Sequence, residues 1–359
     1  MLPQKFSKDE QENKKGGIIK VVGVGGAGGN AINRMIESGV QGAEFIAVNT
    51  DLRILELNKA PIKIQIGANL TQGLGAGGDP KVGEKSALES EDIIRDYLQN
   101  SDMIFITAGM GGGTGTGASP VIAEIARSCA KLVVAVVTLP FSFEGRKKRV
   151  TAIEGIERLK EKVDAIIIIN NDKLLQISDK STFFNDAFKL ADEVLKQAIQ
   201  SVTEIVNVPG LINIDFNDLQ NIMSNAGSAY LGIGIGKGEN RAKEAAKMVL
   251  QSPILDVSIS GAKGVVFNVT GGNDLTLSEV SEISELIVQN ADPEANIKFG
   301  AVIDASMEGI IKVTLIATGF DQKEIYKEDS SKEKKEIYNY NLSENDIEIP
   351  AFLRRRRQI

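Results

Sequence analysis

Residues 111 to 117 read Gly-Gly-Gly-Thr-Gly-Thr-Gly, and they lie between two apolar segments. Met103–Thr107 before them has the continuous apolar pattern of a buried parallel strand, and Ala118–Ala130 after them has the spacing of a helix. Glycines before a helix expose backbone N–H groups and let a ligand approach closely, and Thr114 and Thr116 add hydroxyl groups. The stretch therefore predicts a loop that binds an anion with several oxygens, such as a di- or triphosphate.

Strand and helix patterns alternate over the first two thirds of the chain, which predicts an α/β fold with a doubly wound parallel sheet. The expected strands are Ile18–Val24, Glu44–Asn49, Ile62–Ile66, Met103–Thr107, Leu132–Thr138 and Ala165–Asn170. The expected helices are Gly28–Ser38, Lys81–Gln99, Ala118–Ala130, Lys147–Lys162 and a long Asp186–Val206. An α+β domain is expected next, with helices at Phe216–Asn225, Asn240–Gln251 and Thr276–Asn290, a glycine-interrupted strand between the first two, and strands at Val265–Thr270, Ile297–Ile303 and Ile311–Ala317.

Two more glycine-rich segments follow predicted strands. Gly23, Gly25 and Gly28 fit the pattern G-x-G-x-x-G, and Asp51 follows the second strand, where a ribose-binding carboxylate belongs in a dinucleotide fold. An NAD(P)-dependent oxidoreductase, or glycines that serve only strand–helix packing, therefore stay open as alternatives. The third segment is Gly73–Gly78, and three such loops at the carboxyl ends of parallel strands are expected to converge on one crevice.

Composition excludes several classes of site. The 359 residues include no histidine and one cysteine, Cys129, so a Ser-His-Asp triad, histidine metal ligands and a cysteine-based zinc site are ruled out. The formal net charge of −7 gives no support to nucleic-acid binding. The polar first 15 residues do not resemble a signal peptide, and the apolar runs are too short to span a bilayer. A soluble cytoplasmic protein is expected.

The motifs resemble the FtsZ family of bacterial tubulin-like cell-division GTPases. The similarity is carried by Gly-Gly-Gly-Thr-Gly-Thr-Gly, by Gly23–Asn30, by Asn213–Asp218 and by the closing Asp-Ile-Glu-Ile-Pro-Ala-Phe-Leu-Arg-Arg-Arg, and it covers roughly residues 17 to 320 and the final peptide. The resemblance implies GTP or GDP as ligand and Mg²⁺ held through phosphates and water rather than by protein side chains. It implies a head-to-tail homopolymer at the mid-cell division ring of a bacterium.

The resemblance also implies a set of nucleotide contacts. The GTP-binding residues would be Gly26, Ala27, Gly28, Gly29, Asn30, Asp51, Gly75, Ala76, Gly77, Gly78, Gly111, Gly112, Gly113, Thr114, Gly115, Thr116, Gly117, Glu144, Lys148, Phe188 and Asp192. Glu144 would accept hydrogen bonds from the ribose, Phe188 would stack on guanine, and Asp192 would accept from its N1–H and 2-amino group. Lys148 stands where the family commonly has arginine, and lysine lacks the planar fork of that side chain.

Asn213, Asp215 and Asp218 are ordinary turn and helix-capping residues when read alone. The resemblance implies instead that they form a catalytic loop that acts on the GTP of the neighbouring subunit. A non-hydrolysing nucleotide-binding scaffold is the alternative if the two aspartates are only caps.

The expected domains follow from these assignments. They are a flexible N-terminus (1–16), a GTP-binding domain (17–185), a central helix (186–209), a C-terminal activation domain (210–320), a disordered linker (321–345) and a partner-binding peptide (346–359). In that peptide Ile349, Phe352 and Leu353 are apolar anchors for a partner groove. The resemblance implies membrane-tethering and regulatory division proteins as the partners.

Overall fold

The computed structural model describes residues 17–177, 183–251 and 259–319. The predicted N-terminus 1–16, linker 321–345 and peptide 346–359 lie outside the described residues, and the domain boundaries stay predictions.

The strands and helices largely match the expected ones. The strands are β1 (Ile19–Val24), β2 (Glu44–Asn49), β3 (Ile62–Gln65), β4 (Met103–Gly109), β5 (Leu132–Leu139), β6 (Ala165–Asn170), β7 (Gly227–Lys237), β8 (Gly264–Gly271), β9 (Asn296–Ile303) and β10 (Ile310–Thr318). The helices are α2 (Gly25–Glu37), α3 (Leu52–Glu56), α4 (Ala68–Thr71), α5 (Pro80–Glu89), α6 (Glu91–Leu98), α7 (Gly113–Arg127), α8 (Arg146–Lys160), α9 (Asn171–Ile177), α10 (Phe184–Asn207), α11 (Phe216–Met223), α12 (Arg241–Leu250) and α13 (Leu277–Asn290). Two short 3₁₀ helices are η1 (Ser142–Glu144) and η2 (Ala305–Met307).

The strands form one sheet in the order β3-β2-β1-β4-β5-β6-β7-β10-β8-β9. The first six are parallel, and Val22 of β1 lies opposite Ile46 of β2 and Ile106 of β4. Strand order reverses between β1 and β4, so the chain leaves these two neighbours toward opposite sides of the sheet. In open α/β sheets, ligands bind beyond the carboxyl ends of the strands at such a point.

Both faces of the parallel strands are buried, which explains their continuous apolar sequences. Val21 belongs to a core cluster shared with α2, α10 and α11, whereas Val22 belongs to a second cluster shared with α5, α6, α7 and α8. Neighbouring residues of a strand point to opposite faces, so one strand supplies both cores.

The C-terminal strands are also buried on both faces, although their pairing differs. β7 and β8 are antiparallel to β10, and β9 is parallel to β8 at the edge. Val266 faces the cluster around α10, while Val265 and Phe267 pack with α12 and α13.

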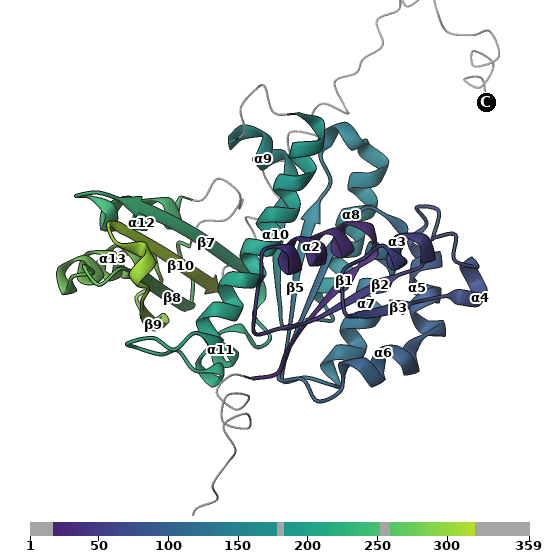
Figure 1. Cartoon of the computed structure of the whole chain (residues 1–359), viewed down its shortest axis with the longest axis horizontal. Coiled ribbons are helices and arrows are strands. Elements are labelled where there is room, and N and C mark those ends of the chain that lie inside the picture. The colour runs from purple at the N-terminus through teal and green to yellow at the C-terminus, as the bar shows by residue number, and fades with distance from the viewer. Residues whose placement is uncertain (1–16, 178–182, 252–258, 320–359) are drawn as a thin grey trace, which may run out of the picture. The chain divides into compact units, whose positions relative to one another are not determined.

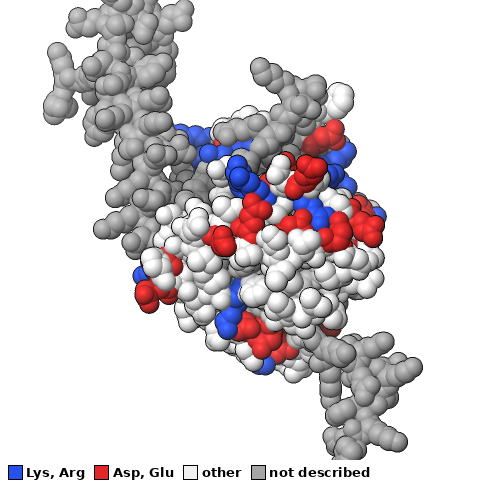
Figure 2. All heavy atoms as spheres, turned by 90° about the vertical axis from the view of Figure 1, so that its left-hand side faces the viewer, with Lys and Arg blue, Asp and Glu red and all other residues white. Residues whose placement is uncertain are grey.

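Figure 1 shows α10 between the two halves of the sheet, with α9 beside its start and α11 after its end. On the face that Figure 2 turns to the viewer, charged groups form a band across the upper part and a smaller group near the bottom, with a broad uncharged area between them.

Three predicted helix boundaries are wrong. The expected helix Lys81–Gln99 is two helices that meet at Ser90, whose buried hydroxyl accepts a hydrogen bond from the Gly67 N–H (3.2 Å). The helices expected from Gly28 and Ala118 begin earlier, at Gly25 and Gly113. Tertiary packing overrides the poor helix propensity of glycine here, because a methyl group on Gly117 would lie 1.9 Å from the Pro80 carbonyl oxygen of α5.

Over the same described ranges, none of the helices combines the length and apolar character that crossing a membrane requires.

Candidate functional site

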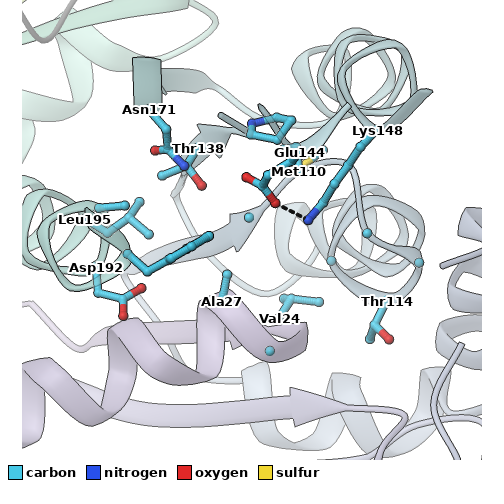
Figure 3. Close-up of a pocket in the computed structure, with 18 residues that line it drawn as sticks. Val24, Ala27, Met110, Thr114, Thr138, Glu144, Lys148, Asn171, Asp192 and Leu195 are labelled. Carbon is cyan, nitrogen blue, oxygen red and sulfur yellow. Dashed lines mark hydrogen bonds and ion pairs between the residues drawn. The ribbon is translucent and has the colours of Figure 1, made fainter. Parts of the chain in front are cut away.

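A cavity of about 260 Å³ opens beyond the carboxyl ends of β1 and β4, where the strand order reverses. It is lined by Val24, Gly26, Ala27, Gly109, Met110, Gly112, Gly113, Thr114, Gly115, Thr138, Pro140, Glu144, Lys148, Asn171, Phe188, Ala191, Asp192 and Leu195. Figure 3 shows Asp192 and Thr114 on opposite sides of this cavity, with the Glu144–Lys148 pair across the cavity from Ala27 and Val24. Two of the three predicted glycine segments therefore meet residues from η1, α8, α9 and α10.

The starts of α2 and α7 lie side by side at the cavity. A methyl group on Gly25, whose φ is +72°, would come within 2.9 Å of the Gly115 amide nitrogen. Neither Val24 nor Gly112 caps its helix with a side chain, and neither helix has an acidic residue in its first turn. A methyl group on Gly26 or Gly112 would meet open space. Two uncapped helix N-termini therefore direct backbone N–H groups at the same place, which suits an anion.

The two threonines of the motif have different environments. Thr114 lines the cavity, and its hydroxyl is 2.7 Å from the hydroxyl of Thr50 at the end of β2. Thr116 is buried, and its hydroxyl accepts a hydrogen bond from the Gly111 N–H (2.8 Å). Thr116 thus shapes the turn before α7, while Thr114 faces the site.

Glu144 and Lys148 form one wall of the cavity. The Glu144 carboxylate accepts a hydrogen bond from the Phe141 N–H (2.9 Å) and pairs with the Lys148 ammonium one helical turn later (Figure 3). Gly111 has a φ of +100°, and a methyl group there would lie 2.7 Å from Lys148. The glycine motif and α8 are therefore in close contact on this side.

The opposite end of the cavity is aromatic and acidic. The Phe188 ring meets Phe141 edge to face at 5.3 Å, and Phe141 stacks on Phe143 at 4.9 Å. Asp192 lies one turn after Phe188 on α10. Burial raises the pKa of Asp192 to about 6, and the charge of Arg34 on α2 opposes that rise. A half-buried ring next to a carboxylate can stack on a planar base and accept hydrogen bonds from its donors.

Asn171 was not among the predicted contacts. It opens α9 at the cavity wall, and its side-chain oxygen is buried without a hydrogen-bond partner within the described residues. An unsatisfied buried acceptor is costly, so its position at the cavity marks it as a candidate ligand contact. No local sequence pattern distinguishes this asparagine from its neighbours.

Several predicted contacts stand apart from the cavity. A methyl group on Gly28 would lie 2.4 Å from the Thr107 carbonyl oxygen, so this glycine allows α2 to pack on β4, and Gly117 allows the contact of α7 with α5. Gly29 and Asn30 line a second, smaller cavity of about 180 Å³ on the α3 side of α2. Their contact with a nucleotide stays a prediction.

The third glycine segment, 73–78, packs against the start of α7. Gly75, Gly77 and Gly78 all have positive φ, and a methyl group on Gly113 would come within 2.8 Å of the Ala76 side chain. The residues of this segment do not line the cavity, and their predicted contact with GTP is not tested by this geometry. Asp51 caps α3 by accepting from the Ile54 N–H (3.2 Å) and forms a β-bridge with Leu74.

The predicted catalytic loop follows the far end of α10. The Asn213 side-chain oxygen accepts from the Gly210 N–H (2.6 Å), and Asp215 caps α11 by accepting from the Asp218 N–H (2.7 Å). The Asp218 carboxylate pairs with Lys298 of β9 at 2.9 Å. The capping role of Asp215 is thus realised, and a role toward a second subunit stays a prediction.

One helix separates the cavity from this loop. α10 has 24 residues, which corresponds to about 36 Å at 1.5 Å per residue. The α10 residues that line the cavity, from Phe188 to Leu195, lie in its first half, whereas Asn213 comes after its last residue. The loop therefore lies beyond the far end of the helix that borders the cavity.

Comparison with known proteins matches both parts of the chain. Residues 18–179 match the Tubulin/FtsZ family, GTPase domain, and residues 227–321 match the FtsZ family, C-terminal domain. The empty FtsZ dimer of M. jannaschii is 46% identical, with a TM-score of 0.80 over 88% of this chain and 93% of that one. A mutant of the same FtsZ is 48% identical, with a TM-score of 0.80 over 86% and 93%.

CetZ2 from Haloferax volcanii, in a GTPγS-bound protofilament, is 19% identical, with a TM-score of 0.74 over 89% of this chain and 98% of that one, and it shares the fold. The dinucleotide oxidoreductase leaves these matches unexplained, and the match to a GTPase domain supports hydrolysis over a non-hydrolysing scaffold. The chain belongs to the tubulin/FtsZ family and is an FtsZ-type GTPase that binds GTP and GDP.

Proposed function

We propose that this GTPase assembles head to tail into filaments and hydrolyses each GTP where two subunits meet. The observation that carries the proposal is that the nucleotide cavity lies beside the first half of α10, whereas the Asn213–Asp218 loop follows its last residue. A subunit built in this way meets its neighbour through two different surfaces, and such contacts can continue as an open filament.

Exposed apolar side chains at both ends support this assembly. Near the phosphate end, Leu57 and Leu74 are 79% and 74% exposed, and Leu211 beside the loop is 79% exposed. Contact between subunits would remove these side chains from water, which favours association. The related FtsZ of M. jannaschii was solved as a dimer.

Within one subunit, the two helix N-termini bind the phosphates through backbone N–H groups, and Thr114 adds a hydroxyl. Glu144 accepts from the ribose, Phe188 stacks on the base, and Asp192 accepts from N1–H and the 2-amino group. Adenine lacks those two donors, so Asp192 selects guanine. Lys148 is already paired with Glu144, and this pair must open or rearrange as the ribose binds.

Asp215 and Asp218 of the next subunit orient and polarise the attacking water, and Asn213 holds the start of their loop. Phosphoryl transfer depends mainly on positioning and electrostatic stabilisation, so no covalent intermediate is required. The absence of histidine from the chain is compatible with this chemistry.

We also propose Mg²⁺ as the cofactor. In the part of the chain that the structure describes, no group of three acidic, cysteine or histidine side chains is placed to hold a metal ion. Phosphate oxygens and water are the ligands that Mg²⁺ commonly keeps, and the ion would balance the phosphate charge.

The test is phosphate release from GTP with Mg²⁺ across a protein dilution series, with light scattering recorded on the same samples. Turnover per molecule is expected to rise above a threshold concentration together with scattering, because each site needs two subunits. Turnover that is constant across the threshold would show that one subunit carries a complete site.

Membership of the FtsZ family supports a proposal for the cellular role. We propose that the filaments form a cytokinetic ring at mid-cell in the cytoplasm, and that Ile349, Phe352 and Leu353 bind membrane-tethering division proteins. Removal of residues 346–359 should leave polymerisation intact and abolish recruitment to the tether. Unchanged recruitment of the shortened chain to the division site contradicts the role of the peptide.

A further inference from the structure

The Asn213–Asp218 loop rests on the edge strand β9. The Leu211 N–H donates to the Ala301 carbonyl oxygen (2.7 Å), and the Ala301 N–H donates to the Ile212 carbonyl oxygen (3.0 Å). Gly210 allows this approach, because a methyl group there would lie 2.4 Å from the same Ala301 oxygen. The backbone entering the loop is therefore fixed on β9.

The same strand supplies a cation to the loop. Lys298 lies three residues before Ala301, and its ammonium is 2.9 Å from Oδ1 of Asp218, with the two side chains 40% and 27% exposed. The hydrogen bond with Asp218 raises the pKa of Lys298, and the charge of Asp215 adds to this effect. Both loop carboxylates therefore act on one lysine.

Each carboxylate has one oxygen engaged. Oδ1 of Asp215 accepts from the Asp218 N–H, and Oδ1 of Asp218 is taken by Lys298. Over the described residues, Oδ2 of neither aspartate has a hydrogen-bond partner. One held oxygen restricts the rotation of the group, while the other can accept a hydrogen bond from water.

We propose that Lys298 is a positioning residue for GTP hydrolysis that holds the Asp218 carboxylate with its second oxygen directed at the attacking water. The proposal rests on the proposed action of the loop on the neighbouring subunit's GTP. The two loop carboxylates must also approach a triphosphate of the same sign of charge. The positive charge of Lys298 beside them lowers the repulsion between the carboxylates and the phosphates.

The chain offers a matched control. Lys312 of β10 pairs with Glu204 of α10 at 2.8 Å, with side chains 25% and 34% exposed. This pair also joins the C-terminal strands to the central helix, and Lys312 has no contact with Asp215 or Asp218 among the described residues. Loss of Lys312 therefore reports the effect of loosening the C-terminal strands without touching the loop.

The experiment compares Lys298→Met, Lys298→Arg and Lys312→Met with the unaltered full chain and with Asp218→Ala. GTP binding, the threshold of assembly, and kcat and KM per assembled subunit are measured for each. Lys298→Met should lower kcat about fivefold, the scale of an exposed ion pair, with KM and GTP affinity unchanged within about twofold. Lys298→Arg should recover at least about half of the rate, and Lys312→Met should retain it.

Unchanged kcat in Lys298→Met would overturn the inference, as would an equal loss in Lys312→Met or a loss explained wholly by a higher assembly threshold. Asp218→Ala separates this failure from that of the proposed function. If Asp218→Ala turns over normally, the action of the loop on GTP is wrong. If only Asp218→Ala loses turnover, the loop acts and Lys298 does not position it.

Discussion

Several groups at the cavity, near the start of α10, have no partner within the described part of the subunit, whereas each of the three polar side chains of the loop beyond its end has one. α2 and α7 begin without side-chain caps, and the Asn171 oxygen is buried without a partner in the described chain. Asn213, Asp215 and Asp218 each hold a hydrogen bond or an ion pair. The cavity is thus suited to binding a ligand, whereas the loop is already held in place by contacts within its own subunit. Binding and chemistry should therefore be separable by mutation.

The largest expected effect comes from the loop. Asp215→Ala or Asp218→Ala should lower turnover at least about hundredfold, the scale seen when a group that stabilises the transition state is lost. GTP affinity should stay within about twofold, because neither residue reaches the cavity of its own subunit. Phosphate release and equilibrium GTP binding measure the two effects.

Asp215→Asn is the control for capping. Asparagine caps a helix as well as aspartate does, so stability should be kept while the negative charge is lost. Asp215→Asn could turn over GTP normally while Asp215→Ala has a lower melting temperature. This outcome would show that Asp215 only caps α11 and has no role in hydrolysis.

The second expected effect comes from Gly112, the N-cap position of α7, where a side chain would meet open space. Gly112→Asp should cap the helix and leave stability equal or slightly higher. The added negative charge repels the phosphates, so GTP affinity should fall about hundredfold. Thermal unfolding and GTP binding should therefore change in different directions. Gly112→Ala, which adds no charge, should bind much better than Gly112→Asp.

The smallest of these effects concerns the pH dependence of Asp192. Its pKa is raised from 3.8 to about 6 by burial, and the proposed contact with guanine requires the ionised form. GTP affinity should fall as the pH drops through about 6, approaching tenfold per pH unit below it. Asp192→Asn should bind GTP more weakly at pH 7 and lose this dependence. The same slope in Asp192→Asn would assign the titration to another group.

The raised pKa of Asp192 affects the stability of the empty protein in the opposite direction: GTP affinity should rise with pH, whereas this contribution to the free energy of unfolding should fall. Between pH about 4 and about 6, the native state binds more protons than the unfolded state, so the free energy of unfolding falls as the pH rises. The contribution is on the order of 3 kcal/mol at most. Denaturation of the empty protein at pH 4.5 and 6.5, with Asp192→Asn as reference, measures it.

The parallel sheet and most helices could be predicted, because buried strands such as Leu132–Leu139 have long apolar runs. The boundary at Ser90 could not, since it depends on a hydrogen bond from Gly67. Gly28 and Gly117 pack against backbone atoms, which the sequence could not show, and their contact with phosphate stays a prediction. Lys298 and Asp218 are 80 positions apart, so only the fold reveals their pairing.

The length of α10 has a consequence for any filament. If the loop of one subunit reaches the cavity of the next, the translation between neighbours is set by the span of this helix, about 36 Å. A bundle of aligned filaments should then diffract with a meridional spacing close to that value. Lengthening α10 by two turns should increase the period by about 11 Å.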